Sequence, residues 1–435
     1  MQRGTKQIIF ILLVVFILAF QSCIEEFDPK DINSKISNEL ETALVVDARI
    51  TDEQKRQSVF LSRVFSFESD GPSWEQNAIV TLTDDSGSVF SFSEDEPGNY
   101  ISEDILTLEA DQEYILEIRT QDGKVYVSER EKIPSKVPIE SIQGKRKESE
   151  SGNEGIGILI SNSIEQDTPT FFRYEYSETY KIVAPDFEPF EWDEVDYDFF
   201  MNDDDGWEVT IKPREEDVRV CYGNNLSEDL ILTSTANLTS GDIENFEIRF
   251  LGRNNPFIAH RYSILVKQYH HSMEANSFFN ALEDFTSFES FFSAKQPGFL
   301  QGNIRALDSD DKVLGYFELS SYTEKRYFFN FEDFFPDESL PPFFINCSFI
   351  GKPALYPEGF HSTEIDGEIV LDGVSNSPLI DGILADSFAF VGENEDYPIN
   401  ELGELDRAPY LVKPVGCVDC RTWGENVVPE FWIEK

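Results

Sequence analysis

Residues 113–120, with the sequence EYILEIRT, decide the fold class of this chain. The apolar residues Tyr114, Leu116 and Ile118 occupy every second position of this stretch, whereas the charged Glu117 lies between two of them. Successive side chains of a β-strand point to opposite faces, so this spacing predicts a strand with one apolar face. We expect that face to pack on an opposing sheet, which favours a β-sandwich.

The same alternation recurs on both sides of this stretch, separated by turns at the spacing typical of a β-sandwich. Residues 85–87 (DSG) and 121–123 (QDG) are such turns, because they include types that tolerate a positive φ. Strands are expected at residues 43–50, 58–64, 78–83, 89–93, 99–102, 113–120 and 124–128. These seven strands predict an immunoglobulin-like or transthyretin-like β-sandwich over residues 43–135.

A larger, mostly antiparallel β-domain is expected over residues 155–435, after a linker or exposed loop at residues 136–154. One packed helix is predicted behind Ser272, because apolar residues between positions 275 and 285 recur at three- and four-residue spacing. Further strands are expected at residues 155–161, 171–182, 207–212, 247–251, 262–269, 313–320 and 325–331. The predicted fold class is therefore mostly β.

The start of the chain has the order of a secretory signal. A short basic region precedes a wholly apolar run at residues 8–20, which leads into Cys23. This run is shorter than the ~20 residues that a membrane-spanning helix needs. A cysteine in this position resembles a lipobox, in which the thiol is acylated and becomes the new N-terminus. We expect a lipoprotein signal peptide at residues 1–22 and a lipidated acidic tether at residues 23–42, held on a membrane by acyl chains.

The charge balance excludes some partners. The chain has 83 acidic and 35 basic residues and a formal net charge of −48. Nucleic acid is not expected as a partner, because each phosphate contact needs a cation to neutralise it. Hydrophobic residues make up 40% of the chain, which is enough for substantial cores and argues against a disordered polyanion.

Four cysteines remain after Cys23, namely Cys221, Cys347, Cys417 and Cys420. An even number in an exported chain favours disulfides over free thiols, and three pairings are open. A four-thiolate zinc site is the alternative, because the CxxC spacing at 417–420 suits a metal knuckle. The chain lacks a second CxxC, so we expect disulfides and no metal.

Motifs for catalysis are few. The sequence contains no GxSxG, P-loop, GxGxxG or HExxH motif, and we expect neither an enzyme nor a cofactor. His270 and His271 are adjacent on a predicted strand, so their side chains point to opposite faces and do not share one ion. The acidic segment 202–206 lacks the ligand spacing of an EF-hand, and we interpret it as a turn.

Aromatic residues cluster on proline-broken or acid-rich segments of the second domain. Such rings can contact a ligand or a partner protein, since exposed aromatic patches usually mark contacts. The alternative is that they fill the core of that domain. The candidate contact residues are Phe334, Phe335, Phe343, Phe344, Trp192 and Trp432.

Several segments in order along the chain resemble one known family. They are residues 44–52 (LVVDARITD), 80–87 (VTLTDDSG), 221–222 (CY), 296–304 (QPGFLQGNI), 315–317 (GYF), 417–420 (CVDC) and 429–432 (PEFW). Together they resemble the Bacteroidetes lipoprotein family called domain of unknown function 4249. The CxDC followed by Pro-acid-Phe-Trp is the most specific of these motifs. Residues 423–426 depart from the more glycine-rich turn that is usual there.

The resemblance implies a role at the cell envelope. Members of that family look like companions of outer-membrane TonB-dependent transporters. The acidic residues directly behind Cys23 also resemble surface-export signals, although a solvated tether explains them too. We therefore expect a non-catalytic, lipid-anchored outer-membrane protein that faces the cell surface and captures an unidentified ligand for a transporter. The alternatives are a free-standing surface module that binds glycan or peptide, and an adhesin-like or envelope-assembly structural protein.

Overall fold

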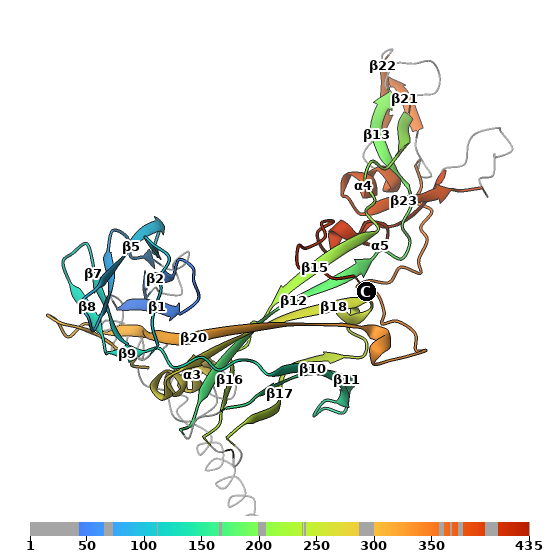
Figure 1. Cartoon of the computed structure of the whole chain (residues 1–435). Helices are drawn as coiled ribbons and strands as arrows, with labels where there is room; N and C mark the ends of the chain where they lie inside the picture. The colour runs from blue at the N-terminus through green and yellow to red at the C-terminus, as the bar shows by residue number, and fades with distance from the viewer. Residues whose placement is uncertain are drawn as a thin grey trace, which may run out of the picture.

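The computed structural model is mostly β, as predicted, and its long strands connect two larger β units (Figure 1). It describes residues 43–64, 73–110, 112–164, 168–198, 206–236, 238, 241–286, 300–355, 361–365, 368–372, 377–395 and 408–434. Cys23 and Asp203 lie outside these residues, so lipidation and the acidic turn stay predictions. No helix in the described ranges is long and apolar enough to cross a membrane.

The N-terminal unit is a curled antiparallel sheet around one apolar core. Its strands are β1 (Leu44–Thr51), β2 (Ser58–Arg63), β3 (Ser73–Trp74), β4 (Ile79–Asp84), β5 (Val89–Glu96), β6 (Asn99–Ser102), β7 (Glu113–Arg119), β8 (Val125–Ser128) and β9 (Glu131–Lys132). The hydrogen-bonded order runs β1-β2-β6-β5-β4-β7-β8. The alternating residues Tyr114, Leu116 and Ile118 of β7 are at most 1% exposed, which confirms the apolar face predicted for this stretch.

The central unit is a two-layer β-sandwich. One layer has the order β15-β12-β18-β20, and the other has the order β10-β11-β17. The bounds are β10 (Ser141–Glu148), β11 (Glu154–Asn162), β12 (Phe171–Val183), β15 (Val220–Leu226), β16 (Ile231–Ser234), β17 (Ile243–Gly252), β18 (Arg261–His271) and β20 (Val313–Asn330), with the 3₁₀ turns η1 (Pro256–Ile258) and η3 (Phe331–Asp333). The strand β19 (Ile304–Ala306) pairs with β8 of the N-terminal unit. Aromatic and branched aliphatic side chains of both layers form its core.

Strand β20 belongs to both units. Its first half, residues 313–320, pairs in parallel with the whole of β1, and its second half, residues 321–330, pairs antiparallel with β18. Phe317 and Leu319 enter the N-terminal core, and Phe329 enters the central core. All three positions have the same parity, so both cores lie on one face of this continuous strand.

The structure differs from the predicted domain boundaries at two places. Residues 136–154, expected as a linker or exposed loop, contain β10, which pairs along its whole length with β11. The N-terminal sandwich, expected to end at residue 135, is completed by β19, which pairs with β8, and by the first half of β20. These strands lie far along the chain, and alternation within a strand carries no information about its distant partner.

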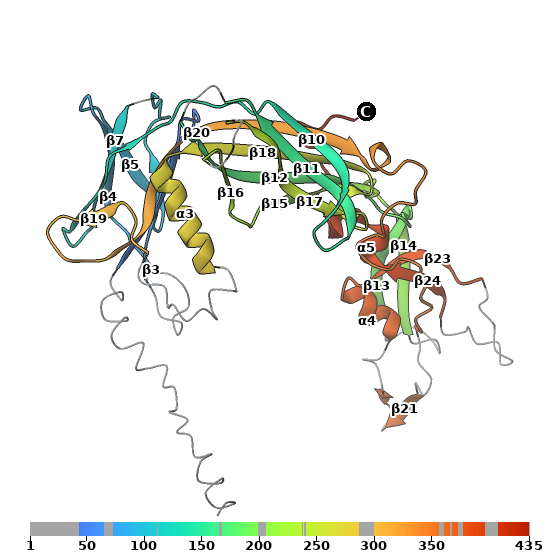
Figure 2. The ribbon, with the colours of Figure 1, turned by 90° about the horizontal axis from the view of Figure 1, so that it is seen from below.

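The predicted helix is α3 (Met273–Thr286), and the Ser272 hydroxyl accepts a hydrogen bond from the Ala275 amide at 3.1 Å. Figure 2 shows α3 at the end of β12, β18 and β20 that is nearest the N-terminal unit. The buried Glu131 of β9 connects the start of α3 to the N-terminal unit. Its carboxylate accepts hydrogen bonds from Ser272 at 3.2 Å, from Tyr316 at 2.7 Å and from Asn303 at 2.9 Å. Burial nonetheless raises the pKa of Glu131.

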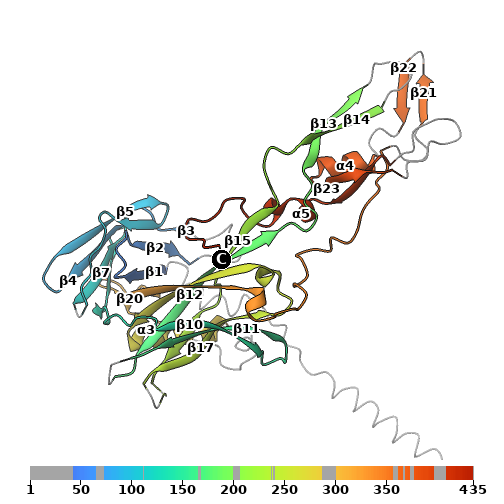
Figure 3. The same ribbon diagram turned by 45° about the vertical axis from the view of Figure 1, so that its right-hand side comes forward.

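A smaller set of elements projects from the central sandwich (Figure 3). It consists of the pairs β13 (Phe190–Asp198) with β14 (Gly206–Pro213), β21 (His361–Ile365) with β22 (Glu368–Asp372), and β23 (Phe388–Glu393) with β24 (Tyr410–Pro414), together with α4 (Pro378–Leu384), α5 (Val415–Val418) and η4 (Cys420–Thr422). A minor core around Leu379 and Val412 holds β14, α4 and β24 together.

Gly315 permits the close pairing of β1 with β20. Its φ is +98°, and a Cβ atom there would lie 1.8 Å from the carbonyl oxygen of Val46. We predict that Gly315→Ala destabilises the protein by clearly more than the roughly 1–2 kcal/mol of left-handed backbone strain, because the two strands must also separate. Gly87→Ala is the matched control, since Gly87 has a φ of +88° and open space around it. Denaturant unfolding of both variants measures the difference, and equal losses would contradict this role of Gly315.

Candidate functional site

A pocket of about 210 Å³ lies where the two larger units meet. It is lined by residues of β1, β2 and the turn between them on one side, and of β12 and β18 on the other. The apolar residues of β1 and β12 enter the two cores, so residues of the opposite parity face the pocket. Its charged lining residues are Arg49, Lys55, Arg56, Arg173, Asp47 and Glu175.

Arg173 is the central cation of this site, and its side chain is 3% exposed. It donates one hydrogen bond to Glu175 at 2.5 Å and another to Glu318 at 3.2 Å. Its guanidinium lies 4.2 Å from the ring centroid of Tyr269 and 5.5 Å from that of Phe279 on α3. Arg173 therefore contacts α3 and the strands β12, β18 and β20, and its Nε atom has no partner among the described residues.

Glu318 is the buried anion opposite Arg173. Burial alone would raise its pKa, but the Arg173 guanidinium and a hydrogen bond from His271 Nδ1 at 3.1 Å outweigh burial and lower the pKa to about 2. A carboxyl group whose pKa is lower in the folded state stabilises the fold above its unfolded pKa. This contribution is therefore complete above pH 4.5 and is lost as the pH falls toward 2.

On the exposed side of the pocket, Arg49 donates two hydrogen bonds to Asp47, both at 2.8 Å. Another nitrogen of the Arg49 guanidinium lies 3.7 Å from Glu175. The ion pairs Asp47–Arg49 and Glu175–Arg173 thus form one chain of alternating charge from β1 to β12. This row of ion pairs connects the N-terminal unit to the central sandwich across the pocket.

The aromatic residues predicted as contacts mostly pack within the protein. Phe335 is 1% exposed and stacks on Phe331, and half-buried Phe334 packs edge-on against Phe329. Half-buried Phe343 and Phe344 pack against the central core, and Phe344 stacks on Trp423 at 4.8 Å.

The two tryptophans are also used internally. Trp192 packs edge-on against Phe390 and Tyr410, and its indole donates a hydrogen bond to the Phe388 carbonyl at 2.8 Å. Trp432 is 8% exposed and lies against Tyr222 and Phe328. Phe335 and Trp432 are buried, which favours the core alternative for these two, whereas Trp192, Phe334, Phe343 and Phe344 are half-buried and their contact role stays a prediction.

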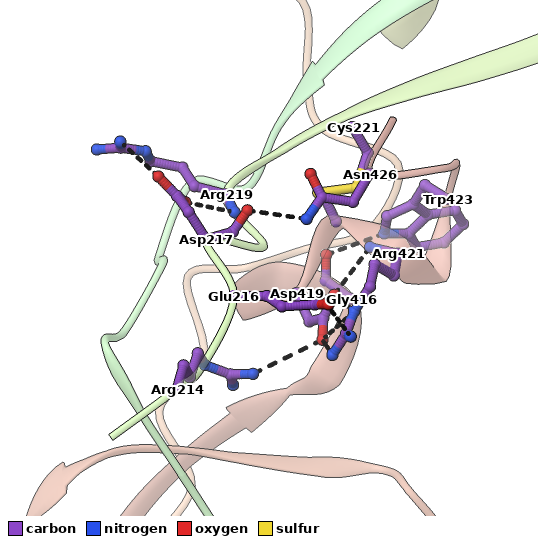
Figure 4. Close-up of a disulfide and its surroundings, with 11 residues drawn as sticks. Arg214, Glu216, Asp217, Arg219, Cys221, Gly416, Asp419, Arg421, Trp423 and Asn426 are labelled. Atoms are coloured by element: carbon purple, nitrogen blue, oxygen red, sulfur yellow. Dashed lines mark hydrogen bonds and ion pairs between the residues drawn. A yellow bond between two sulfur atoms is a disulfide. The ribbon is translucent and has the colours of Figure 1, made fainter. Parts of the chain in front are cut away.

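The four cysteines form two disulfides, Cys221–Cys420 and Cys347–Cys417. Figure 4 shows the first, with Asp419 of the CxDC motif near the bridge. Asp419 accepts hydrogen bonds from Arg421, the shortest at 2.6 Å, and lies 3.7 Å from Arg214. The bridges confirm the disulfide prediction, and they leave no cysteine thiolate among the four for a zinc site.

Sequence reasoning missed the pocket. Residue 173 is far along the chain from residues 49 and 56, and the fold alone brings them together. The strand containing Arg173 was predicted, but a charged residue that alternates with apolar ones is typical of a solvated face. No local signal distinguishes Arg173 from an ordinary surface arginine.

We predict that Glu318→Gln lowers the free energy of unfolding at neutral pH by about 3–5 kcal/mol, because Arg173 loses its buried charge partner. The variant should also lose stability less steeply than the wild type as the pH falls from 4.5 toward 2. Denaturant unfolding at neutral and acidic pH measures both effects. Glu117→Gln is the control, since Glu117 is 44% exposed and its ion pair with Arg119 is worth little. A similar loss of free energy of unfolding in both variants would show that the buried pair adds no stability.

We further predict that peptide mapping without reductant recovers the pairs Cys221–Cys420 and Cys347–Cys417. Replacing both cysteines of either bridge with alanine should lower the free energy of unfolding by about 2–5 kcal/mol. A different pairing, or free thiols at all four positions, would contradict the structure.

The family comparison agrees with the motifs between residues 44 and 317, whereas those at 417–420 and 429–432 lie outside the matched range. No curated protein matches the chain. The model of a family described as Domain of unknown function (DUF4249) matches residues 26–326, from the predicted tether to within β20. This match covers more than half of the 435 residues, including all of the described N-terminal unit up to β9 and most of the central sandwich. The chain therefore belongs to the DUF4249 family.

Proposed function

We propose that this protein is a non-catalytic, lipid-anchored accessory protein of an outer-membrane TonB-dependent transporter, and that its junction pocket receives the ligand. The observation that carries the proposal is the pocket itself, which the N-terminal unit and the central sandwich build together. Ligand sites occur preferentially where two units meet and are usually preformed.

The rigid connection of the two units supports a preformed site. Strand β20 continues from one unit into the other without a break, and the Arg173–Glu318 pair lies buried at the crossing. A site held by such contacts loses little conformational freedom on binding, which favours affinity. The pocket is thus suited to capture a ligand without a large rearrangement.

The compartment follows from two independent features. The apolar run that ends at Cys23 is typical of a lipoprotein signal. Two disulfides fit an oxidising space outside the cytoplasm. The association with a transporter rests on the family resemblance, and the orientation toward the cell surface rests on the acidic residues behind Cys23.

We predict that Cys23→Ala releases the protein from the membrane fraction, because the acyl chains are its anchor. Fractionation and mass spectrometry of the N-terminus measure this. The variant in which alanine replaces both Cys347 and Cys417 is the control for cysteine replacement elsewhere in the chain, and it should stay with the membrane. A Cys23→Ala protein that still fractionates as an integral membrane protein would overturn the lipid anchor.

Partnership with a transporter is tested by pull-down of the full-length lipoprotein in mild detergent. We expect a TonB-dependent outer-membrane transporter to be recovered. Recovery of no membrane partner would contradict the accessory role and would favour the free-standing binding module, which uses the same pocket.

A further inference from the structure

The pocket is less acidic than the rest of the protein. The whole protein has 83 acidic and 35 basic residues, whereas the charged lining of the pocket has four basic and two acidic side chains. Lys55 and Arg173 also pair with Glu53 and Glu318 outside the lining, so Arg56 is the lining cation without an ion pair among the described residues. The pocket is thus close to neutral within a strongly acidic molecule, and it repels a negative group less than the rest of the surface does.

Arg56 is the arginine of the pocket with hydrogen-bonding capacity to spare. It is exposed and has no hydrogen bond or ion pair within the described residues. Arg173 does not add a donor, because its terminal nitrogens bond Glu175 and Glu318 and its unpaired Nε has no exposed surface. A guanidinium binds the oxygens of carboxylate and phosphate groups through two parallel hydrogen bonds, so both groups are suitable ligands of Arg56.

The turn that carries Arg56 and Lys55 is held in place before any ligand binds. Gln57 is 1% exposed, and its side chain accepts a hydrogen bond from the Thr51 amide at 3.2 Å and donates one to the Glu53 carbonyl at 3.0 Å. The Gln57 amide donates to the Ser102 hydroxyl at 3.0 Å. These buried contacts connect both ends of the turn between β1 and β2. The two cations at its tip are thus presented from a fixed backbone.

The remaining lining contains two aromatic rings. The Arg173 guanidinium lies 4.2 Å from the centroid of Tyr269, which leaves less of that ring for stacking, whereas Phe60 is 44% exposed. A neutral ligand would leave the guanidinium of Arg56 without a charged partner. The volume of about 210 Å³ fits a small molecule or one terminal group of a larger one.

We infer that the junction pocket binds a small ligand through an oxyanion, either a carboxylate or a phosphate, which Arg56 binds. The inference deepens the proposed function, on which it rests for the use of this pocket as the ligand site. Arg56 supplies the charge, and the fixed turn between β1 and β2 positions it, whereas Arg173 with Glu175 and Glu318 forms part of the pocket wall.

Isothermal titration of the detergent-solubilised full-length protein with inorganic phosphate and with succinate, at constant ionic strength, tests the inference. Glucose 6-phosphate against glucose, and succinate against its diamide, show whether the phosphate or the carboxylate is the source of binding. We expect at least one anion to bind and its neutral counterpart to fail. Arg56→Gln should weaken that binding roughly tenfold or more, because a charge-assisted hydrogen bond is lost.

Arg119→Gln is the matched control, since Arg119 is an exposed arginine of β7 outside the pocket and its side chain is 51% exposed. It should leave anion binding unchanged, and neither substitution should alter unfolding. Absence of binding by both anions at millimolar concentration, or equal binding by wild type and Arg56→Gln, would overturn the inference. These outcomes do not affect acylation of Cys23 or recovery of a transporter, so failure here is distinguishable from failure of the proposed function.

Discussion

The parallel pairing of β1 with the first half of β20 is the interaction on which the rest of the structure depends. It inserts a strand from late in the chain beside the first strand of the N-terminal unit, where Phe317 and Leu319 complete that core. The same strand then continues into the central sandwich. Parallel neighbours need a long connection, and here the connection contains the other strands of the N-terminal unit and most of the central unit. The N-terminal unit therefore reaches its complete form only when the chain has been folded through residue 320.

The buried Arg173–Glu318 pair lies where this shared strand passes from one unit to the other. Burying two charges is costly, and their attraction offsets the cost only when hydrogen bonds satisfy the remaining atoms. His271 and Glu175 supply such bonds, and the rings of Tyr269 and Phe279 flank the guanidinium. A mismatched register of β18 against β20 would separate His271 from Glu318 and leave the charge unpaired. We therefore interpret the pair as a device that selects one register at the crossing.

Local pattern predicted most strands of the N-terminal unit, the strands β11, β12, β14, β17, β18 and β20, helix α3 and the oxidation of the four cysteines, because alternation, capping by Ser272 and an even thiol count are local or compositional signals. It missed β10, β13, β15, β16 and β19. The partners of β19 and β20 and the pairing of Cys221 with Cys420 could not be predicted, since each joins segments far apart in the chain. The burial of Phe335 and Trp432 could not be predicted for a similar reason. A dense run of rings indicates apolar area to be buried, but whether the chain itself covers that area depends on its tertiary neighbours.

The sequence motifs also acquire a physical meaning that the resemblance alone did not supply. Gly302 and Gly315 approach each other so closely that a Cβ atom on Gly302 would lie 1.7 Å from the Gly315 carbonyl oxygen. Asn303, between Gly302 and β19, accepts a hydrogen bond from the Phe317 amide and donates one to its carbonyl, both at 2.9 Å. Two of the motifs thus build the crossing of β20, and the CxDC motif fastens the C-terminal segment to β15 through Cys420. Since the crossing also positions Arg173 beside Arg49, the residues that resemble the family act on the pocket indirectly, by holding its two walls at a fixed separation.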